Sequence, residues 1–308
     1  MRKPKGLPTH GWLILDKPQG LTSTDAVNRV KRLFEAQKAG HAGTLDPLAT
    51  GLLPIALGEA TKTVPYVVDG EKSYRFSVTW GAETDTDDSE GKVVKTSEAR
   101  PDRHDIEAIL SEFTGEIQQM PPQYSAIKVA GERAYDLARD GQVFELAARP
   151  VTVHVLRLTA HTADNTVTIF ECDCGKGTYV RSLARDIGRR LGCLGHVTVL
   201  RRTRVGPFTE SAAISLDKLS ETANSAAGRE GLMNFLRPVE TALDDIPALS
   251  VTSADAARLN RGQPILIRGA GAPILTGPAY ALCKGSLVAI GEIQQGELHP
   301  LRVFNLAS

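Results

Sequence analysis

Alternating hydrophobic and polar residues mark the strands of this chain. The clearest case is residues 73 to 80, SYRFSVTW, in which every second side chain is aromatic or aliphatic. A period of two puts these apolar side chains, from Tyr74 to Trp80, on one face and predicts a half-buried β-strand. Apolar runs at residues 12 to 15 and 167 to 174 predict two more strands.

Apolar residues three and four positions apart mark the helices. A helix is expected from about Ser23 to Glu35, because Thr22 and Asp25 resemble a capping box and apolar residues follow at helical spacing. Shorter helices are expected at 105 to 113 and 133 to 139. Another should follow Thr178, with a buried stripe made of Val180, Leu183, Ile187 and Leu191 and with Gly192 as its end.

The composition of the chain changes after residue 204. Residues 220 to 231, SETANSAAGREG, are small and polar and predict a flexible surface loop. From about residue 250, one short helix precedes short strand-like runs separated by glycine and proline. This pattern predicts two domains, residues 1 to 247 and a small β-rich domain of residues 248 to 308.

Overall composition is that of a globular protein, with 42% hydrophobic and 23% charged residues in 308. No apolar run reaches the length of a membrane span, and the apolar segment near the start is too short for a signal peptide, so a cytoplasmic protein without membrane contact is expected. The cysteines should be reduced and structural, since Cys172 and Cys174 form C-x-C rather than the C-x-x-C spacing of redox or zinc sites.

Charge is balanced, with 36 basic and 36 acidic residues, so only its distribution can indicate a partner. Basic clusters lie at 2 to 5, 31 to 32, 181 to 190 and 201 to 204, and acidic residues gather at 83 to 90. The separation allows a basic face for phosphates and an acidic rim, although each cluster alone is also typical of solvated surface.

Two familiar ligand motifs are absent from the polar segments. The GEATKT segment lacks the pattern of a phosphate-binding P-loop, and the acidic stretch from Asp85 lacks the glycine and glutamate of a calcium loop. We therefore expect no nucleotide site, no metal and an acidic hairpin loop.

Candidate chemistry centres on residues 40 to 54, GHAGTLDPLATGLLP, where Asp46 is the one carboxylate among small and apolar residues. Glycine and proline predict a shaped loop, and Asp46 is either a turn residue or a presented acid. Arg181 falls in a helix first turn, where a cation is unfavourable without an anionic partner, and Asp46 is the candidate. The alternatives are a surface arginine and, for Tyr74, an ordinary core tyrosine.

Aromatic and basic residues interleave between residues 124 and 135. This arrangement suits stacking on bases and pairing with phosphates, but it is also common on ordinary surfaces. The residues concerned are Tyr124, Lys128, Arg133 and Tyr135.

Six motifs follow one another along residues 11 to 206: DKPQGLTS, GHAGTLDPLATGLLP, KSYR, GAETDTDD, PPQYSAIKVAGERAY and GKGTYVRSLARDIG. In this order they resemble the bacterial TruB family of tRNA pseudouridine synthases, which act on the T-loop uridine (position 55 of tRNA). Residues 250 to 308 resemble, more weakly, a PUA-like RNA-binding domain. Thr44, where many relatives have alanine, and residues 220 to 231, which look like an insertion, depart from the family pattern.

The resemblance implies an α+β fold: a catalytic domain built on a mixed, largely antiparallel sheet flanked by helices, followed by the PUA-like domain. It implies an isomerase that flips the base out of its stack and needs no cofactor. Asp46 would attack carbon, stabilise positive charge on the sugar or take a proton, and these three roles stay open. Tyr74 would stack on the uracil and could also take part in proton transfer, and Arg181 would hold Asp46 ionised and oriented.

RNA-binding residues are implied in the same way. His41 would fill the space that the flipped base leaves, and Tyr179 and Leu200 would line the pocket. Expected phosphate contacts are Lys17, Lys62, Lys128, Arg201 and Arg202.

The expected partner is a tRNA, bound by its T-arm with the acceptor stem at the C-terminal domain, and the expected state is a monomer. Two rival readings remain open. One is an RNA-folding module without catalysis, and the other is a carboxylate-dependent RNA N-glycosidase, which would release free uracil.

Overall fold

The computed structural model describes residues 6–306 except 126, 130, 143 and 268–275, and it leaves out the side chain of Arg133. The predicted basic cluster at residues 2 to 5 therefore lies outside the described residues.

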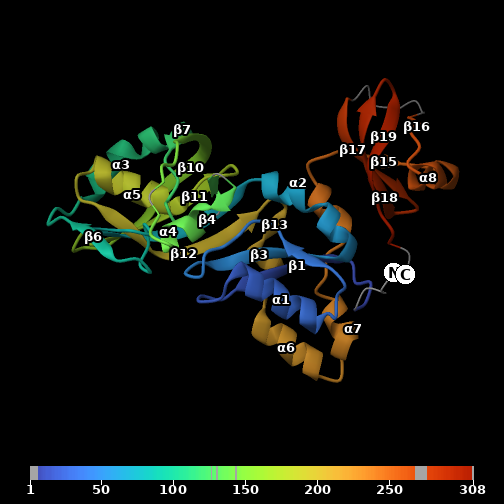
Figure 1. Cartoon of the computed structure of the whole chain (residues 1–308), viewed down its shortest axis with the longest axis horizontal. Coiled ribbons are helices and arrows are strands. Elements are labelled where there is room, and N and C mark those ends of the chain that lie inside the picture. Colours follow the sequence, from blue (N-terminus) through green and yellow to red (C-terminus); the bar gives the residue numbers. More distant parts are fainter. Residues whose placement is uncertain (1–5, 126, 130, 143, 268–275, 307–308) are drawn as a thin grey trace.

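A mixed sheet forms the body of the molecule (Figure 1). Within the described residues its main path runs β14-β1-β3-β12-β4-β11-β10-β7, with β2 paired to β3 and β13 to β12. Only β1–β14 and β3–β12 pair in parallel, so the sheet is largely antiparallel as expected. Its strands are β1 (Gly11–Lys17), β2 (Ala39–His41), β3 (Thr50–Leu57), β4 (Lys72–Trp80), β7 (Gly115–Gln119), β10 (Arg149–His161), β11 (Val167–Cys174), β12 (Gly195–Val205), β13 (Phe208–Thr209) and β14 (Ile214–Ser215).

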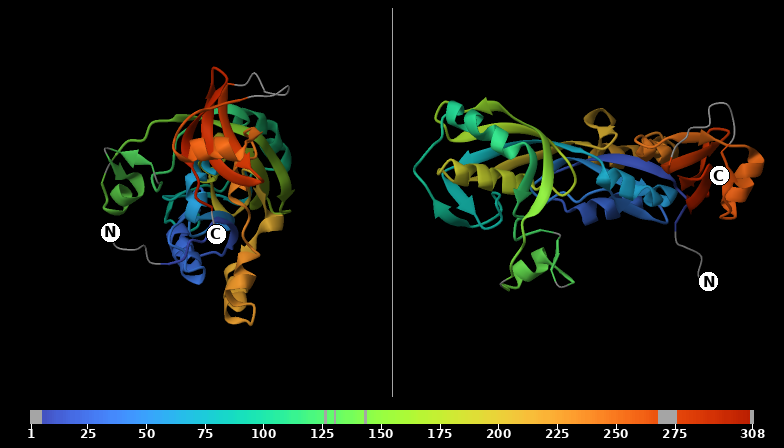
Figure 2. Two further views of the ribbon diagram at one scale, coloured as in Figure 1. Left: turned by 90° about the vertical axis from the view of Figure 1, so that its right-hand side faces the viewer. Right: turned by 90° about the horizontal axis from the view of Figure 1, so that it is seen from above.

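Helices flank this sheet, and Figure 2 shows them beside the strands in two further directions. The predicted cap of α1 is present, because the Thr22 side chain accepts a hydrogen bond from the Asp25 backbone N–H. The helices are α1 (Ser23–Leu33), α2 (Val64–Asp69), α3 (Arg103–Ile109), α4 (Ala134–Arg139), α5 (Val180–Arg190), α6 (Leu216–Asn224) and α7 (Gly228–Met233), with 3₁₀ turns η1 (Gly58–Lys62), η2 (Leu110–Phe113), η3 (Glu210–Ala212) and η4 (Val239–Leu243).

Two small hairpins stand apart from the large sheet. One joins β5 (Ala82–Thr84) to β6 (Val93–Thr96), and the other joins β8 (Lys128–Val129) to β9 (Glu132–Arg133). In the right-hand view of Figure 2, the segment that carries β8, β9 and α4 projects away from the body.

The loop predicted for residues 220 to 231 is wrong, because this segment is largely helical in α6 and α7. Ser215 caps α6 by accepting a hydrogen bond from the Lys218 backbone N–H. Leu216 and Leu219 are buried on one face of α6, and Leu232 is buried on α7. Burial of a few leucines at helical spacing thus stabilises these two helices, although the residues between the leucines are small and polar.

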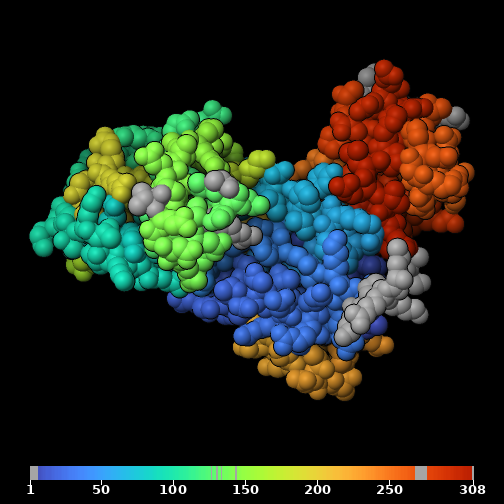
Figure 3. Space-filling view, viewed as in Figure 1, coloured from blue at the N-terminus to red at the C-terminus, as the bar shows by residue number. Residues whose placement is uncertain are grey.

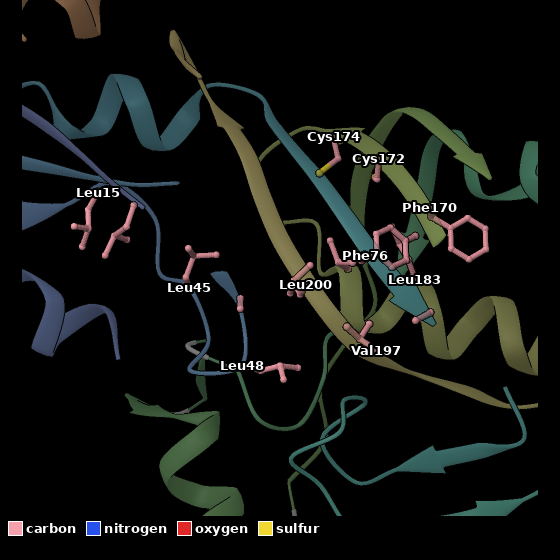
Figure 4. Close-up of a cluster of buried hydrophobic side chains, with 14 of the residues drawn as sticks. Leu15, Leu45, Leu48, Phe76, Phe170, Cys172, Cys174, Leu183, Val197 and Leu200 are labelled. Carbon is pink, nitrogen blue, oxygen red and sulfur yellow. The ribbon is translucent and has the colours of Figure 1, made fainter. Parts of the chain in front are cut away.

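The inward face predicted for β4 forms the centre of the core (Figure 4). Phe76 stacks on Phe170 of β11 with ring centroids 5.3 Å apart, and Trp80 meets Phe170 edge-on at 6.3 Å. Leu183 of α5 is buried in the same cluster. The buried Cys172 shares it, and all four cysteines are free thiols.

The C-terminal residues form a second sheet in the order β15-β17-β18-β19-β16, seen as a separate lobe in the space-filling view (Figure 3). This arrangement confirms the predicted short strands and helix, while the boundary at residue 247 stays a prediction. Ile290 and Phe304 of this part are buried in one cluster with Trp12 and Val67. The elements are β15 (Ala248–Ser250), α8 (Ser253–Asn260), β16 (Ile265–Leu266), β17 (Gly277–Cys283), β18 (Ser286–Gln294) and β19 (Glu297–Val303).

Replacing Phe170, which is fully buried, by alanine should cost about 3–5 kcal/mol of unfolding free energy, because the cavity left between two aromatic rings cannot close. Urea unfolding measures this. Val199→Ala is the control, since Val199 is 57% exposed on β12 and should change stability by less than about 0.5 kcal/mol. Equal small losses in both variants would contradict this account of the core.

Candidate active site

The loop that carries Asp46 runs between the end of β2 at His41 and the start of β3 at Thr50. The hydroxyl of Ser23 accepts a hydrogen bond from the Leu45 N–H at 2.9 Å and donates one to the Leu45 carbonyl at 3.0 Å. Side-chain bonds therefore give the loop a defined shape, as its glycine and proline content predicted.

Arg202 of β12 donates hydrogen bonds to the backbone of the same loop and of β3. Its guanidinium donates to the carbonyls of Gly43 at 3.0 Å, Thr44 at 3.4 Å and Leu52 at 2.8 Å, and the side chain is buried. Gly51 allows the backbone of β12 to lie close to β3, because a Cβ at Gly51 would lie 2.2 Å from the Arg202 carbonyl oxygen. The expected phosphate contact of Arg202 is corrected: its donors are committed to the backbone inside the protein.

Lys17 likewise lies inside the protein and not on its surface. Its Nζ donates to the carbonyls of Pro18 at 2.9 Å, Leu21 at 2.8 Å and Pro47 at 3.3 Å, and the residue is fully buried. Burial lowers the pKa of Lys17 to about 8, although the charge of Asp46 acts in the opposite direction. The expected phosphate contact of Lys17 is therefore also corrected.

The predicted pair between Asp46 and Arg181 is present. The Arg181 Nε lies 3.0 Å from the Asp46 Oδ2, and the arginine side chain is 6% exposed while that of Asp46 is 37% exposed. The Arg181 Nη1 and Nη2 donate to the carbonyls of Thr86 at 2.8 Å and Tyr124 at 2.9 Å, and the Asp88 Oδ2 lies 3.5 Å from Nη1. Carboxylates and carbonyls thus compensate for the cation in the first turn of α5.

The acidic cluster and the arginines of α5 pair with each other. Arg185 Nη1 lies 2.8 Å from Asp87 Oδ2, and Arg189 Nε lies 2.7 Å from Glu83 Oε2. Arginines four residues apart share one helix face, which explains the regular pairing. This corrects the expectation of a basic face opposed to an acidic rim, because in this region the two sets of charges neutralise each other.

An open cavity of about 300 Å³ lies over this pair. Burial raises the pKa of Tyr74 to about 12, and burial also raises the pKa of Tyr179, so both phenols are neutral at pH 7. The cavity joins six of the predicted site residues: Asp46, Tyr74, Tyr179, Arg181, Leu200 and Arg202.

The other predicted site residues do not line this cavity. His41 lies in β2 opposite Ile55 of β3, and Lys128 is exposed on β8. Arg201 forms ion pairs with Asp16 at 2.9 Å and with Glu210 at 2.6 Å.

Lys62 makes structural contacts outside the cavity. Its Nζ lies 2.6 Å from the Glu59 carboxylate, donates to the Val303 carbonyl at 2.8 Å and sits 5.5 Å from the centre of the Phe304 ring. These contacts tie η1 to the end of β19. The expected phosphate contact of Lys62 stays a prediction, because its side chain is 31% exposed.

Two residues at the site, Lys72 and Gln119, were not predicted from the sequence. Lys72 is buried, lines the cavity and donates to the Gly70 carbonyl at 2.5 Å. Its signal was present in the sequence, because extending the period of two by one step from Tyr74 puts Lys72 on the inward face. Gln119, which bonds both the N–H and the carbonyl of Tyr179, had no comparable signal.

Among the residues that the structure describes, no group of three or more His, Cys, Asp or Glu side chains could hold a metal ion. No helix in that part of the chain is both long and apolar enough to cross a membrane.

A largely antiparallel sheet that places Asp46 in a cavity with two arginines and two tyrosines fits the pseudouridine synthase class, to which the relatives of this chain belong. The chain belongs to the TruB family of pseudouridylate synthases. The N-terminal domain of that family matches residues 31–180, and the tRNA pseudouridylate synthase B C-terminal domain matches residues 181–244. The resemblance of the six motifs is confirmed.

Relatives and solved structures agree with this assignment. The chain is 62% identical over 299 residues to a tRNA pseudouridine synthase B of Nitrobacter winogradskyi, covering 97% of this chain and 83% of the relative. It is 56% identical to the protein of the same name from Agrobacterium fabrum, covering 98% and 97%. A chain in a crystal structure of a Cbf5-Nop10-Gar1 complex superposes with a TM-score of 0.74 at 27% identity, covering 96% of this chain and 84% of that one.

The buried Lys17 makes stability depend on pH. The pKa of Lys17 is about 8 in the folded protein, compared with 10.5 for an exposed lysine in the unfolded chain. Between these two pH values the unfolded chain binds more protons than the folded protein, so the free energy of unfolding rises with pH. Relative to Lys17→Met, the wild-type protein should gain up to about 3 kcal/mol over that window. Urea unfolding of both proteins from pH 7.5 to 10.5 measures the difference. A difference that does not change with pH would contradict the burial of a titrating amine.

Proposed function

We propose that this pseudouridine synthase isomerises the T-loop uridine at position 55 of tRNA, with Asp46 as its catalytic carboxylate. The observation that carries this proposal is the ion pair of Asp46 with Arg181 at the edge of the cavity. The names of the relatives, tRNA pseudouridine synthase B, support tRNA as the substrate.

The reaction breaks the N1–C1′ bond, turns the uracil and forms a C5–C1′ bond, with no net redox change. A carboxylate can attack carbon, stabilise a positively charged sugar or accept a proton. Arg181 engages one oxygen of Asp46, Oδ2, and so fixes the direction in which the carboxylate meets the cavity. Asp46 remains 37% exposed, which leaves it accessible to a bound nucleotide.

The cavity walls suit a single pyrimidine nucleotide. Asp46 stands in the wall of this cavity, so a uridine must leave its stack to reach it, at a cost of a few kcal/mol. Tyr74 would stack on the uracil and take part in proton transfer through its hydroxyl, and Tyr179 and Leu200 would line the pocket around it. His41, at the start of the Asp46 loop, would occupy the space that the base leaves in the RNA.

The remaining assignments concern the wider RNA interface. Lys128, exposed on the projecting β8–β9 hairpin, is the proposed phosphate contact on the T-arm. Arg201 is a weaker candidate, because its charge is already paired with Asp16 and Glu210. We further propose that residues 248 to 308 form a PUA-like domain which holds the acceptor stem, that residues 1 to 247 form the catalytic domain, and that a monomer works in the cytoplasm.

Replacing Asp46 by asparagine tests the proposal. Asparagine keeps the size of the side chain but cannot act as a nucleophile or base, so tritium release from C5-labelled uridine in T-arm RNA should fall by about 10²–10⁴-fold or more. Binding of the RNA should change little. Wild-type tritium release in Asp46→Asn would refute the catalytic role.

The control is Asp217→Asn, which removes an exposed carboxylate on α6 outside the cavity and should leave tritium release unchanged. The same assay separates the rival readings. An RNA-folding module would release no tritium even as wild type, and an N-glycosidase would release free uracil instead of retaining the base.

A further inference from the structure

Arg202 lies between the two sides of the active site. It is 1% exposed, and on one side its guanidinium bonds the carbonyls of Gly43, Thr44 and Leu52, which begin and end the Asp46 loop. On the other side, the pairing of β12 with β4 puts Arg202 directly opposite Tyr74. Both side chains line the same cavity, and the Arg202 charge opposes the effect of burial on the pKa of Tyr74. One side chain therefore lies between the loop of Asp46 and Tyr74.

The charge of Arg202 is unusual for its place. Among the residues that the structure describes, no carboxylate forms an ion pair with it: its hydrogen bonds go to carbonyls, and the charge of Asp46 acts on it only from beyond ion-pair distance. Burying a cation without a counter-ion is costly, and neutral residues of similar size often fill such positions at lower cost. Arg202 keeps its buried positive charge in the wall of the cavity despite this desolvation cost, which indicates a role beyond packing.

We propose that Arg202 is a positioning residue for the isomerisation, which fixes the hydroxyl of Tyr74 relative to Asp46 and supplies positive charge beside that oxygen. This inference rests on the roles proposed above for Asp46 and Tyr74. The guanidinium does not reach the substrate in this role. It acts through the phenol and through the backbone of the loop.

The surroundings of Tyr74 make the role measurable. Titratable groups near Tyr74 are Arg202 from β12 and the thiols of Cys172 and Cys174 from β11, and its cavity is also lined by Asp46, Lys72, Tyr179 and Arg181. Arg202, directly opposite Tyr74 on the neighbouring strand, opposes the effect of burial on the pKa of Tyr74. Removing the charge should therefore move any limb of the pH–rate profile that depends on Tyr74 to higher pH.

The test compares Arg202→Gln and Arg202→Lys in the wild-type and Tyr74→Phe backgrounds of the full chain. Single-turnover rates on a T-arm hairpin RNA, followed for hours where needed, report the chemistry, and filter binding reports Kd. In the wild-type background, Arg202→Gln should slow isomerisation by about 100-fold, with Kd within about threefold. Arg202→Lys, which keeps the charge, should recover about tenfold of that loss.

In the Tyr74→Phe background the hydroxyl is missing. The fold-loss in isomerisation rate caused by Arg202→Gln should therefore be less than about a fifth of the fold-loss in the wild-type background. A purely structural role would give the same fold-loss in both backgrounds and an unshifted pH profile, and that result would overturn the proposal. Should Arg202→Gln fail to fold, the same comparison is made with Arg202→Lys.

Arg185→Gln is the matched control. Arg185 is also a buried arginine, but it bonds Asp87 and the Met120 carbonyl and does not contact Tyr74. Its fold-loss should be equal in both backgrounds. The Asp46→Asn variant separates this inference from the proposed function: if Asp46→Asn is inactive and the Arg202 variants show no coupling to Tyr74, only the role of Arg202 is refuted.

Discussion

The ion pair between Asp46 and Arg181 is the interaction on which the rest of the structure depends. It joins the loop after β2 to the first turn of α5. The remaining donors of Arg181 reach the carbonyls of Thr86 and Tyr124, so the acidic loop and the segment before the projecting hairpin meet at the same point. The Asp46 loop, α5, the acidic loop and the segment before the projecting hairpin therefore meet at Arg181, and together they hold the Asp46 carboxylate at the cavity.

Buried cations supply the frame around this pair, and they explain what the sequence could not show. Lysine and arginine are expected at the surface, which is why Lys17 and Arg202 were predicted to contact phosphates. Their partners are backbone carbonyls, and some of these come from the loop, 30 residues away for Lys17 and Pro47 and 159 for Arg202 and Gly43. Every residue has a carbonyl, so no pattern in the sequence marks these contacts.

Other parts of the site and fold could be predicted because they follow from local rules. The period of two in β4 put Tyr74 on the inward face, and a cation in a helix first turn required an anion, which Asp46 provides. The order of strands in the sheet depends on long-range pairing and was not predicted, and the family resemblance implied only that the sheet is mixed and largely antiparallel. Residues 220 to 231 were misread since small polar residues also occur in helices that rest on a few buried leucines.

The most direct test of this account is the single-turnover rate of Arg181→Lys on T-arm RNA. A lysine keeps the charge but has no fork of donors to reach Asp46 and the carbonyls of Thr86 and Tyr124 together. The account predicts a loss of about 100-fold or more in rate, with RNA affinity within about threefold of wild type. A rate within about threefold of wild type would contradict it, because charge alone would then suffice to activate Asp46.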